Sequence, residues 1–457
     1  MAIDKSFYKA LLRLSLPIAA QNVLTFLIGL ADNIMVSTLG ETAVSGVFVA
    51  NQITNLLQML TLGLGAALTV LAAQYWGKKD VRSVRSIVGV GFRLAVGAGL
   101  ILFLLVRLFP EKAIGLFTDD PGALQAGAEY VRIVSFTYLP FCVTALLIAA
   151  MRCVETVRLG TRTALVSLIV NVTLNYLLIF GKLGFPRLGL AGAAWATLIS
   201  RLAALAISVV YVAHFDRKLL LTLQDLFSLR SPFTHDFFRY GLPVIAGDLL
   251  WGVNMAVQGS IIGHLDTTSI AAVSVANTFF SILSVGLYGT RDASSILIGK
   301  TVGSGDRDRV ILYSRRLQIV YVLLGLLTGA VVLSSQLLIP LLYRGLDGAT
   351  IDMAKQLLRV LSVTVVGTAY QMSVLTGIVR AGGATRFVLV NDLIFVWLIV
   401  IPSAAVAAFA LHAPTWVVFA CLKCDQILKC AVAYIKVNRF RWIRDLTQPK
   451  LEKEKTI

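Results

Sequence analysis

Twelve long apolar runs constrain this chain more than any other feature of its sequence. Each is long enough to cross a bilayer as a helix, which takes about twenty residues at 1.5 Å per residue. Backbone N–H and C=O groups in lipid need partners within their own segment, so runs of this length are predicted to be helices. The predicted spans are residues 14–39, 44–75, 87–109, 129–151, 163–181, 191–213, 240–263, 269–300, 317–342, 355–379, 386–409 and 414–435. The fold class is therefore predicted to be an all-α membrane protein with twelve transmembrane helices.

The composition agrees with a membrane protein, and the placement of the basic residues orients it. The chain has 457 residues, of which 57% are hydrophobic and 14% charged, whereas soluble domains carry about 25% charged residues. The net charge of +17 comes mainly from segments that follow the even-numbered spans: Lys78, Lys79, Arg82 and Arg85; Arg152, Arg158 and Arg162; Arg217, Lys218, Arg230 and Arg239; Arg307, Arg309, Arg315 and Arg316; Arg380 and Arg386; Lys436, Arg439, Arg441 and Arg444. The alternate loops hold only Lys112, Lys182, Arg187 and Arg344. Basic loops face the cytoplasm, so both termini are predicted to be cytoplasmic, in the cell membrane, with no nucleic-acid partner.

The two halves of the sequence resemble each other at a nearly fixed offset. At an offset of 226, Leu16-Pro17 matches Leu242-Pro243, Gly63 matches Gly289, and Asp80 matches Asp306. Six spans per half return the chain to the same side of the membrane, so the repeats are parallel. The predicted domains are an N-terminal six-helix lobe at 1–213, a cytoplasmic inter-lobe linker at 214–239, and a C-terminal six-helix lobe with a cytoplasmic tail at 240–457.

Motifs that resemble enzyme or metal signatures do not hold together. Gly299-Lys300-Thr301 ends like a phosphate-binding loop, but Ser294 stands where that loop needs its first glycine. Gly303-Ser304-Gly305-Asp306 resembles a membrane protease motif, but it repeats the loop that ends at Asp80, and a helix-joining turn explains it better. Cys421-x-x-Cys424 has no histidine nearby and lies in an apolar run. The chain is therefore predicted to be neither an enzyme nor a metalloprotein.

Asp32 is the first candidate for function, because it is a carboxylate within the first span. A charge there costs several kcal/mol unless it faces a bundle interior or a wet cavity. Asn171 and Asn175 lie at a similar depth in the fifth span and share one helix face. One acid and two amides can hold a proton or coordinate Na⁺. The alternatives are an acid satisfied for packing alone, and amides that only join helices. Arg201 in the sixth span has no evident partner.

The second half carries a different set of polar residues. Asp248 in the seventh span and Arg291-Asp292 in the eighth have similar depths, so Asp248 and Arg291 are a candidate buried pair. Such a pair would either gate a cleft or only neutralise itself. Asp392 lies in the eleventh span and is a further cavity candidate. The spacing in the twelfth span suggests local pairing or snorkelling of Lys423, Asp425 and Lys429.

Pro17 and Pro243 each remove a helical hydrogen bond and permit a bend. Gly286 and Gly289 are predicted to act similarly in the eighth span. Simple packing is the alternative, since Gly and Pro are common in membrane helices.

Several ordered fragments resemble the MATE (multidrug and toxic compound extrusion) family of the bacterial type. They are Ala31-Asp32-Asn33-Ile34-Met35-Val36, Arg152-x-x-Glu155-Thr156, Asn171-x-x-x-Asn175-Tyr176, Leu188-Gly189-Leu190-Ala191-Gly192-Ala193-Ala194 and Arg380-Ala381-Gly382-Gly383-Ala384-Thr385-Arg386. The resemblance covers almost the whole chain.

This resemblance implies efflux of small organic, often cationic compounds in exchange for H⁺ or Na⁺, with no cofactor beyond that ion. Asp32 matches the family's first-helix coupling carboxylate, and Asn171 matches an asparagine near it. Asn175 stands where some members carry an aspartate. Some members begin the seventh span as Pro243 to Asp248 does, whereas others place the acid where this chain has Trp251. A monomer surrounded by membrane lipids is expected.

Three other functions remain as alternatives. A lipid-linked precursor flippase of related architecture would need a strongly cationic cavity, for which only Arg291 and Arg201 are candidates. An intramembrane enzyme would need a paired nucleophile or a metal set. A passive channel would need a selectivity filter, and the sequence contains no recognisable one.

Overall fold

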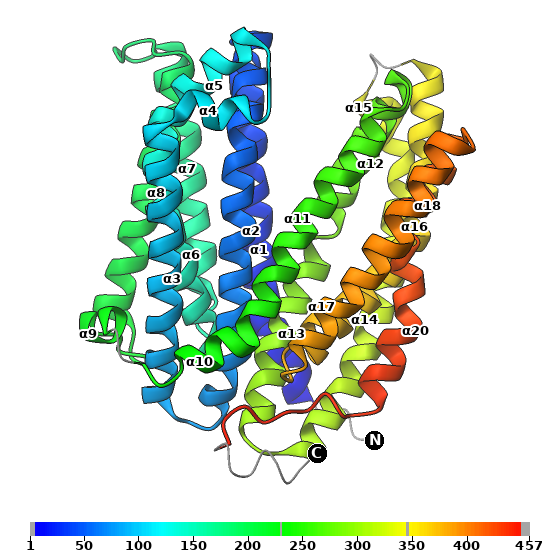
Figure 1. Ribbon diagram of the computed structural model, residues 1–457. Helices are drawn as coiled ribbons and strands as arrows, with labels where there is room; N and C mark the ends of the chain where they lie inside the picture. Colours follow the sequence, from blue (N-terminus) through cyan, green and yellow to red (C-terminus); the bar gives the residue numbers. More distant parts are fainter. Residues whose placement is uncertain (1–4, 229–230, 344–346, 449–457) are drawn as a thin grey trace. The chain divides into compact units, whose positions relative to one another are not determined.

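The structure is a computed structural model that describes residues 5–228, 231–343 and 347–448 (Figure 1). It is 85% helical, and the described ranges contain no β-strand. The predicted all-α fold class is thus confirmed. Arg230 and Arg344, two of the predicted loop cations, and residues 449–457 of the predicted tail lie outside the described residues.

The first half of the chain forms helices that follow the predicted spans closely. They are α1 (Lys5–Ser37), α2 (Glu41–Gly77), α3 (Val81–Leu108), α4 (Pro110–Gly115), α5 (Pro121–Val134), α6 (Tyr138–Cys153), α7 (Arg158–Phe180), α8 (Leu190–Val210), α9 (Leu223–Phe227) and α10 (Thr234–Asp236). A short 3₁₀ turn joins α5 to α6, so that Pro121–Cys153 can cross a membrane as one unit.

The second half is less regular. Its helices are α11 (Leu242–Gly263), α12 (Thr267–Leu283), α13 (Val285–Gly303), α14 (Arg307–Ser335), α15 (Ile339–Leu342), α16 (Gly348–Met372), α17 (Thr385–Phe395), α18 (Ile401–Ala405), α19 (Thr415–Leu422) and α20 (Asp425–Asn438). Helices α16, α17 and α18 each continue into a wider π-helical segment, at Ser373–Val379, Val396–Val400 and Val406–Ala410.

Ten of the predicted spans are continuous and apolar enough to cross a membrane, within the described residues. The eighth predicted span is α12 plus α13, which are bent by 45° at Ser284, two residues before Gly286. The twelfth predicted span is not one helix. Helix α19 ends at Leu422 and α20 begins at Asp425, so Lys423 and Cys424 interrupt it. These charged and small residues break a run that hydrophobicity alone predicted to be continuous.

The turn before α14 confirms the predicted structural role of the Gly303–Asp306 motif. Asp306 caps α14, because its side chain accepts a hydrogen bond from the Arg309 N–H at 3.0 Å. Asp80 caps α3 in the same way, accepting from Ser83 N–H at 3.1 Å. Caps of this kind satisfy N–H groups that the first helical turn leaves free. The two aspartates thus start helices at equivalent positions of the repeat.

The residues fall into two compact units that do not follow the sequence halves everywhere. Unit 1 comprises Met1–Ala19, Ala73–Lys79 and Leu250–Ile457, and unit 2 comprises Ala20–Ala72 and Asp80–Leu249. Helices α1, α2 and α11 therefore each contribute to both units. In α1 the boundary between the units falls between Ala19 and Ala20, shortly after Pro17, which lies inside the continuous helix. The predicted domain boundaries at 213 and 240 remain predictions about the sequence repeat.

The predicted linker, residues 214–239, packs within unit 2. The Asp216 side chain is buried and accepts hydrogen bonds from the N–H groups of the three residues Lys218, Leu219 and Leu220. Lys218 Nζ in turn donates to the carbonyl of Val154 at 2.6 Å. This lysine thereby satisfies a carbonyl at the end of α6.

Candidate functional site

Asp32, Asn171 and Asn175 come together in unit 2, as the sequence predicted. The Asn175 Nδ2 group donates to Asp32 Oδ1 at 2.5 Å and to Asn171 Oδ1 at 3.2 Å. Both asparagines are fully buried, and Asp32 is half-buried. The cluster joins α1 to α7, whose i, i+4 spacing places both amides on one face. Within the described ranges, Asp32 makes no ion pair.

Two buried polar atoms of this cluster have no hydrogen-bond partner among the residues that the structure describes. They are Asn171 Nδ2 and Asn175 Oδ1. Leaving a buried polar group unpaired usually costs about 1–3 kcal/mol. Together with the carboxylate of Asp32, the two amide oxygens form an oxygen-rich set of the kind that binds a hard cation. An amide can also accept from a protonated carboxyl group if it turns, so the same residues can hold a proton.

Arg201 is part of the same environment, which the sequence did not reveal. Its guanidinium lies over the ring of Phe141, 4.8 Å from the centroid. It interacts electrostatically with Asp32 and with the Tyr130 hydroxyl. Within the described residues, no hydrogen bond or ion pair joins Arg201 to Asp32. Arg201 and Asp32 lie on helices far apart in the sequence, and no sequence pattern predicts which of their faces meet.

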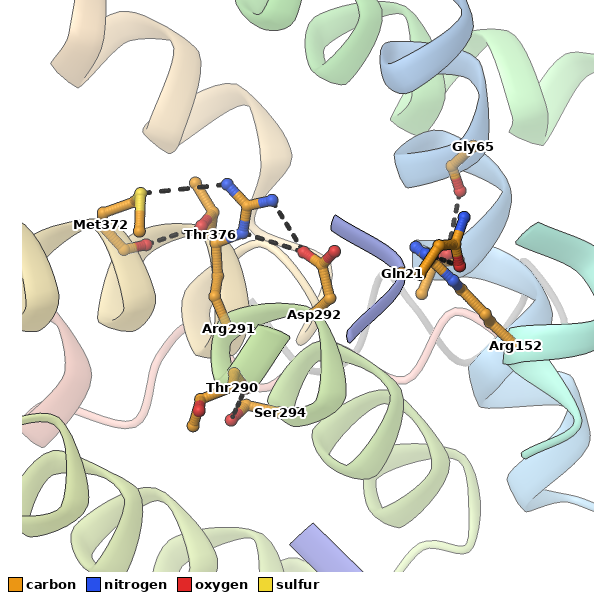
Figure 2. A network of polar contacts seen from close by, with 10 residues as sticks. Gln21, Gly65, Arg152, Thr290, Arg291, Asp292, Ser294, Met372 and Thr376 are labelled. Carbon is orange, nitrogen blue, oxygen red and sulfur yellow. Dashed lines mark hydrogen bonds and ion pairs between the residues drawn. The ribbon is translucent and has the colours of Figure 1, made fainter. Parts of the chain in front are cut away.

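The second-half residues Arg291 and Asp292 pair with each other on α13. Arg291 Nη2 lies 2.8 Å from Asp292 Oδ1, and its Nη1 lies 3.9 Å from the sulfur of Met372 (Figure 2). The guanidinium also faces the Tyr288 ring, with its carbon 5.4 Å from the centroid. The side chains of Arg291 and Asp292 remain about a quarter exposed. The ion pair with the adjacent Asp292 thus neutralises at least part of the positive charge of Arg291.

Asp248 lies on the part of α11 that belongs to unit 2, where its Cβ is close to Gly63 on α2. The predicted pairing of Asp248 with Arg291 stays a prediction, because the two residues belong to different units.

Asp392 belongs to an ion-pair network in unit 1. Lys429 Nζ lies 2.8 Å from Asp392 Oδ1 and 3.0 Å from Asp425 Oδ2. Lys429 and Asp425 are buried, whereas the Asp392 side chain is 39% exposed. Asp425 also accepts from Gln426. The spacing had suggested local pairing or snorkelling, and the structure shows the local pair of Asp425 with Lys429. The contact of Lys429 with Asp392 on α17 depends on packing.

No group of three or more His, Cys, Asp or Glu side chains within the described residues is arranged to hold a metal ion. The contacts of Asp32, Asn171 and Asn175 make the candidate site a mixed acid and amide cluster.

These features define a multi-pass helical membrane protein with a polar site inside its first-half helices. The MatE family profile matches residues 17–177 and 243–421. The chain belongs to this family, the MATE transporters, and to its bacterial type.

Its relatives share a modest sequence identity over long stretches. It is 26% identical over 325 residues to "Probable multidrug resistance protein NorM" of Thermotoga maritima, covering 71% of this chain and 69% of the relative. It is 25% identical over 463 residues to "Uncharacterized transporter YisQ" of Bacillus subtilis, covering 96% of both. It is 25% identical over 402 residues to "Multidrug resistance protein MdtK" of Pectobacterium atrosepticum, covering 86% of both.

Solved structures share the fold. A crystal structure of a MATE protein in complex with MaL6 has a TM-score of 0.85 at 18% identity, covering 94% of this chain and 95% of that chain. The eukaryotic MATE transporter AtDTX14 has a TM-score of 0.84 at 19% identity, covering 96% and 97%. The chain therefore has the twelve-span, two-lobe fold of these structures.

Proposed function

We propose that this protein exports small organic cations across the cell membrane in exchange for H⁺ or Na⁺. The two lobes alternate between states open to either side, and both termini lie in the cytoplasm. The coupling ion binds at Asp32 with help from Asn171 and Asn175. The observation that carries the proposal is the half-buried carboxylate of Asp32, which is bonded to a buried amide cluster with two polar atoms that lack a partner among the described residues.

The chemistry of the cluster supports a site that gains and loses a cation. Asp32 has no ion-pair partner in the part of the chain that the structure describes, so its charge is not permanently neutralised by contact. Asn175 holds the ionised carboxylate by donating Nδ2. When a proton or Na⁺ arrives, the amide oxygens offer it further partners.

Coupling requires the ion and the substrate to favour opposite states, because a ligand with equal affinity for both shifts nothing. Ion binding at Asp32 from outside would favour return to the inward state, where the substrate loads. One H⁺ exchanged for one monovalent cation moves no net charge, so only the pH gradient would drive it. Each additional cation that enters adds about 2.3 kcal/mol per 100 mV, or about 45-fold in the substrate gradient.

The relatives favour efflux over a lipid-linked precursor flippase, because two of those described above are named multidrug resistance proteins. The family consists of transporters, so an enzyme is not favoured either.

The test is transport of a fluorescent organic cation in proteoliposomes, with H⁺ and Na⁺ gradients imposed separately. We expect one gradient to drive export by the wild-type protein, and Asp32→Asn to lose that gradient dependence. The matched control is Asp119→Asn, which removes an exposed carboxylate between α4 and α5. Gradient-driven export by Asp32→Asn at the wild-type rate would remove Asp32 from the mechanism.

A further inference from the structure

Gln74, near the end of α2, is fully buried although its side chain is a polar amide. Its Oε1 accepts a hydrogen bond from the Leu446 N–H at 2.8 Å, and its Nε2 donates to the Ala381 carbonyl at 3.2 Å. Both partners are backbone groups of the second half of the chain. No sequence motif and no hydrophobic periodicity had indicated a role for Gln74.

The segment that binds Gln74 follows α20, and we call residues 439–447 the C-terminal strap (red in Figure 1). Trp442 anchors the strap: it is fully buried, and a Cβ added at Gly382 would lie 2.2 Å from its ring. The Arg444 N–H donates to the Gly382 carbonyl at 2.8 Å. The strap is therefore firmly seated on the loop before α17.

Two further contacts join the strap to the end of α2. Lys78 Nζ donates to the Thr447 carbonyl at 3.3 Å, and the Tyr75 hydroxyl donates to the Leu446 carbonyl at 3.5 Å. With Gln74, three residues within five positions of α2 and its following turn bind the strap. The strap thus connects a first-half helix to the second half within unit 1.

Beside the strap, the ends of α2 and α13 pack backbone against backbone. A Cβ added at Gly77 would lie 1.9 Å from the Lys300 carbonyl oxygen, and one added at Gly303 would lie 1.8 Å from the Gln74 carbonyl oxygen. Adding the repeat offset of 226 to Gly77 and Gln74 gives Gly303 and Lys300, so each contact is the repeat-related counterpart of the other. The interface is therefore nearly two-fold symmetric. In the contacts described above, the strap bonds to the end of α2 and its following turn, and none of these contacts involves α13.

We propose that Gln74 is a positioning residue for transport, held by the C-terminal strap so that α2 stays packed on α13. This inference rests on the proposed alternating access, in which the cytoplasmic ends of the two halves have to separate. Gln74 packs in unit 1 with the strap, whereas α2 up to Ala72 belongs to unit 2. An opening in which this end of α2 moves away with the rest of its helix then requires the Gln74 amide to leave Leu446 and Ala381. The strap acts as a latch that sets how often the inward state forms.

The experiment measures opening directly, by hydrogen–deuterium exchange of the full chain in lipid nanodiscs. Gln74→Leu replaces the amide with an apolar side chain of similar size and leaves two buried backbone groups of the closed state, the Leu446 N–H and the Ala381 carbonyl, without their partner. Stranding of this kind is expected to shift the opening equilibrium by about 5- to 150-fold. We expect faster exchange in the peptide covering residues 293–303 of α13, which packs on α2 but is not the site of the substitution.

Gln448→Leu is the matched control, because it makes the same substitution at an exposed position directly after the strap. It should exchange like the wild type. Trp442→Phe unseats the strap without changing Gln74, and it decides the question if Gln74→Leu fails to fold. It should also speed exchange in the α13 peptide.

If the α13 peptide exchanges at the control rate in the folded variants, the latch is refuted. If exchange rises in Gln74→Leu while no variant, nor the wild type, moves a cation, the latch stands and the proposed efflux function fails. Increased exchange confined to the strap peptide, with α13 unchanged, would also overturn the proposal, because it would show a structural tie only.

Discussion

The glycine contact between α13 and α2 gives the sharpest prediction. In Gly303→Ala the new Cβ would lie 1.8 Å from the Gln74 carbonyl oxygen and 2.5 Å from the carbonyl carbon. Ordinary contacts begin at 3.4 Å, so the two backbones would have to part by about 1.6 Å. Both contacting atoms belong to the backbone of Gln74, so no side-chain rotation can relieve the clash.

Overpacking of this kind costs about 1–3 kcal/mol, and the small helix-propensity gain of Ala at the last residue of α13 offsets little of it. We therefore expect a lower Tm for Gly303→Ala in detergent, and a larger share of protein with α2 and α13 apart. The assay is thermal unfolding of the purified full chain, followed by intrinsic tryptophan fluorescence.

Gly259→Ala on α11 is the matched control, because nothing lies within 4 Å of an added Cβ there. Ala is favoured over Gly inside a helix by up to about 1 kcal/mol, so this variant should be as stable as the wild type or slightly more so. Equal Tm values for the two variants would refute the packing argument.

Three further predictions concern charged and polar groups. Asn175→Asp places a second carboxylate against Asp32, and we expect export to depend more strongly on an imposed Na⁺ gradient, measured in proteoliposomes. Lys429→Met strands the two carboxylates that it bridges and should cost about 3–5 kcal/mol, whereas Lys355→Met, at an exposed pair, should change stability little in the same denaturation assay. Hydrogen bonds from a neighbouring serine lower the pKa of Asp266, which caps α12. The ionised Asp266 therefore contributes to the free energy of unfolding above its unfolded pKa of about 4, and this contribution is lost as the pH falls through the lower pKa of the folded state. The difference in Tm between the wild type and Asp266→Ala should shrink in acid.

Several features of the site were readable from the chain. Asp32 stood out because a carboxylate in an apolar run is costly, and the spacing of Asn171 and Asn175 placed them on one face; the structure joins all three. The repeat also favoured a helix-joining turn at Gly303–Asp306, and in the structure Asp306 of that turn caps α14. Arg201 could not be assigned, since its neighbours come from helices distant in sequence.

The second half was less predictable. The twelfth predicted span is broken at Lys423 and Cys424, because a hydropathy window averages over two residues that leave the helix. Lys429 was predicted to pair locally, and its second partner, Asp392, lies on another helix. The proposed pair of Asp248 and Arg291 was based only on their similar depth in two spans. Depth does not show which faces of the two helices meet.

The sequence by itself determined that the chain is a bundle of membrane-spanning helices with an internal repeat and an acid within the first span. Length, apolar content and periodicity are properties of local stretches of the chain, so they can be read without the fold. Tertiary structure decided which helix ends share a compact unit. Residues 73–79 join the second half through Gln74 and closely packed glycine backbones. Such contacts depend on the fit of backbones hundreds of residues apart, and no local pattern encodes that fit.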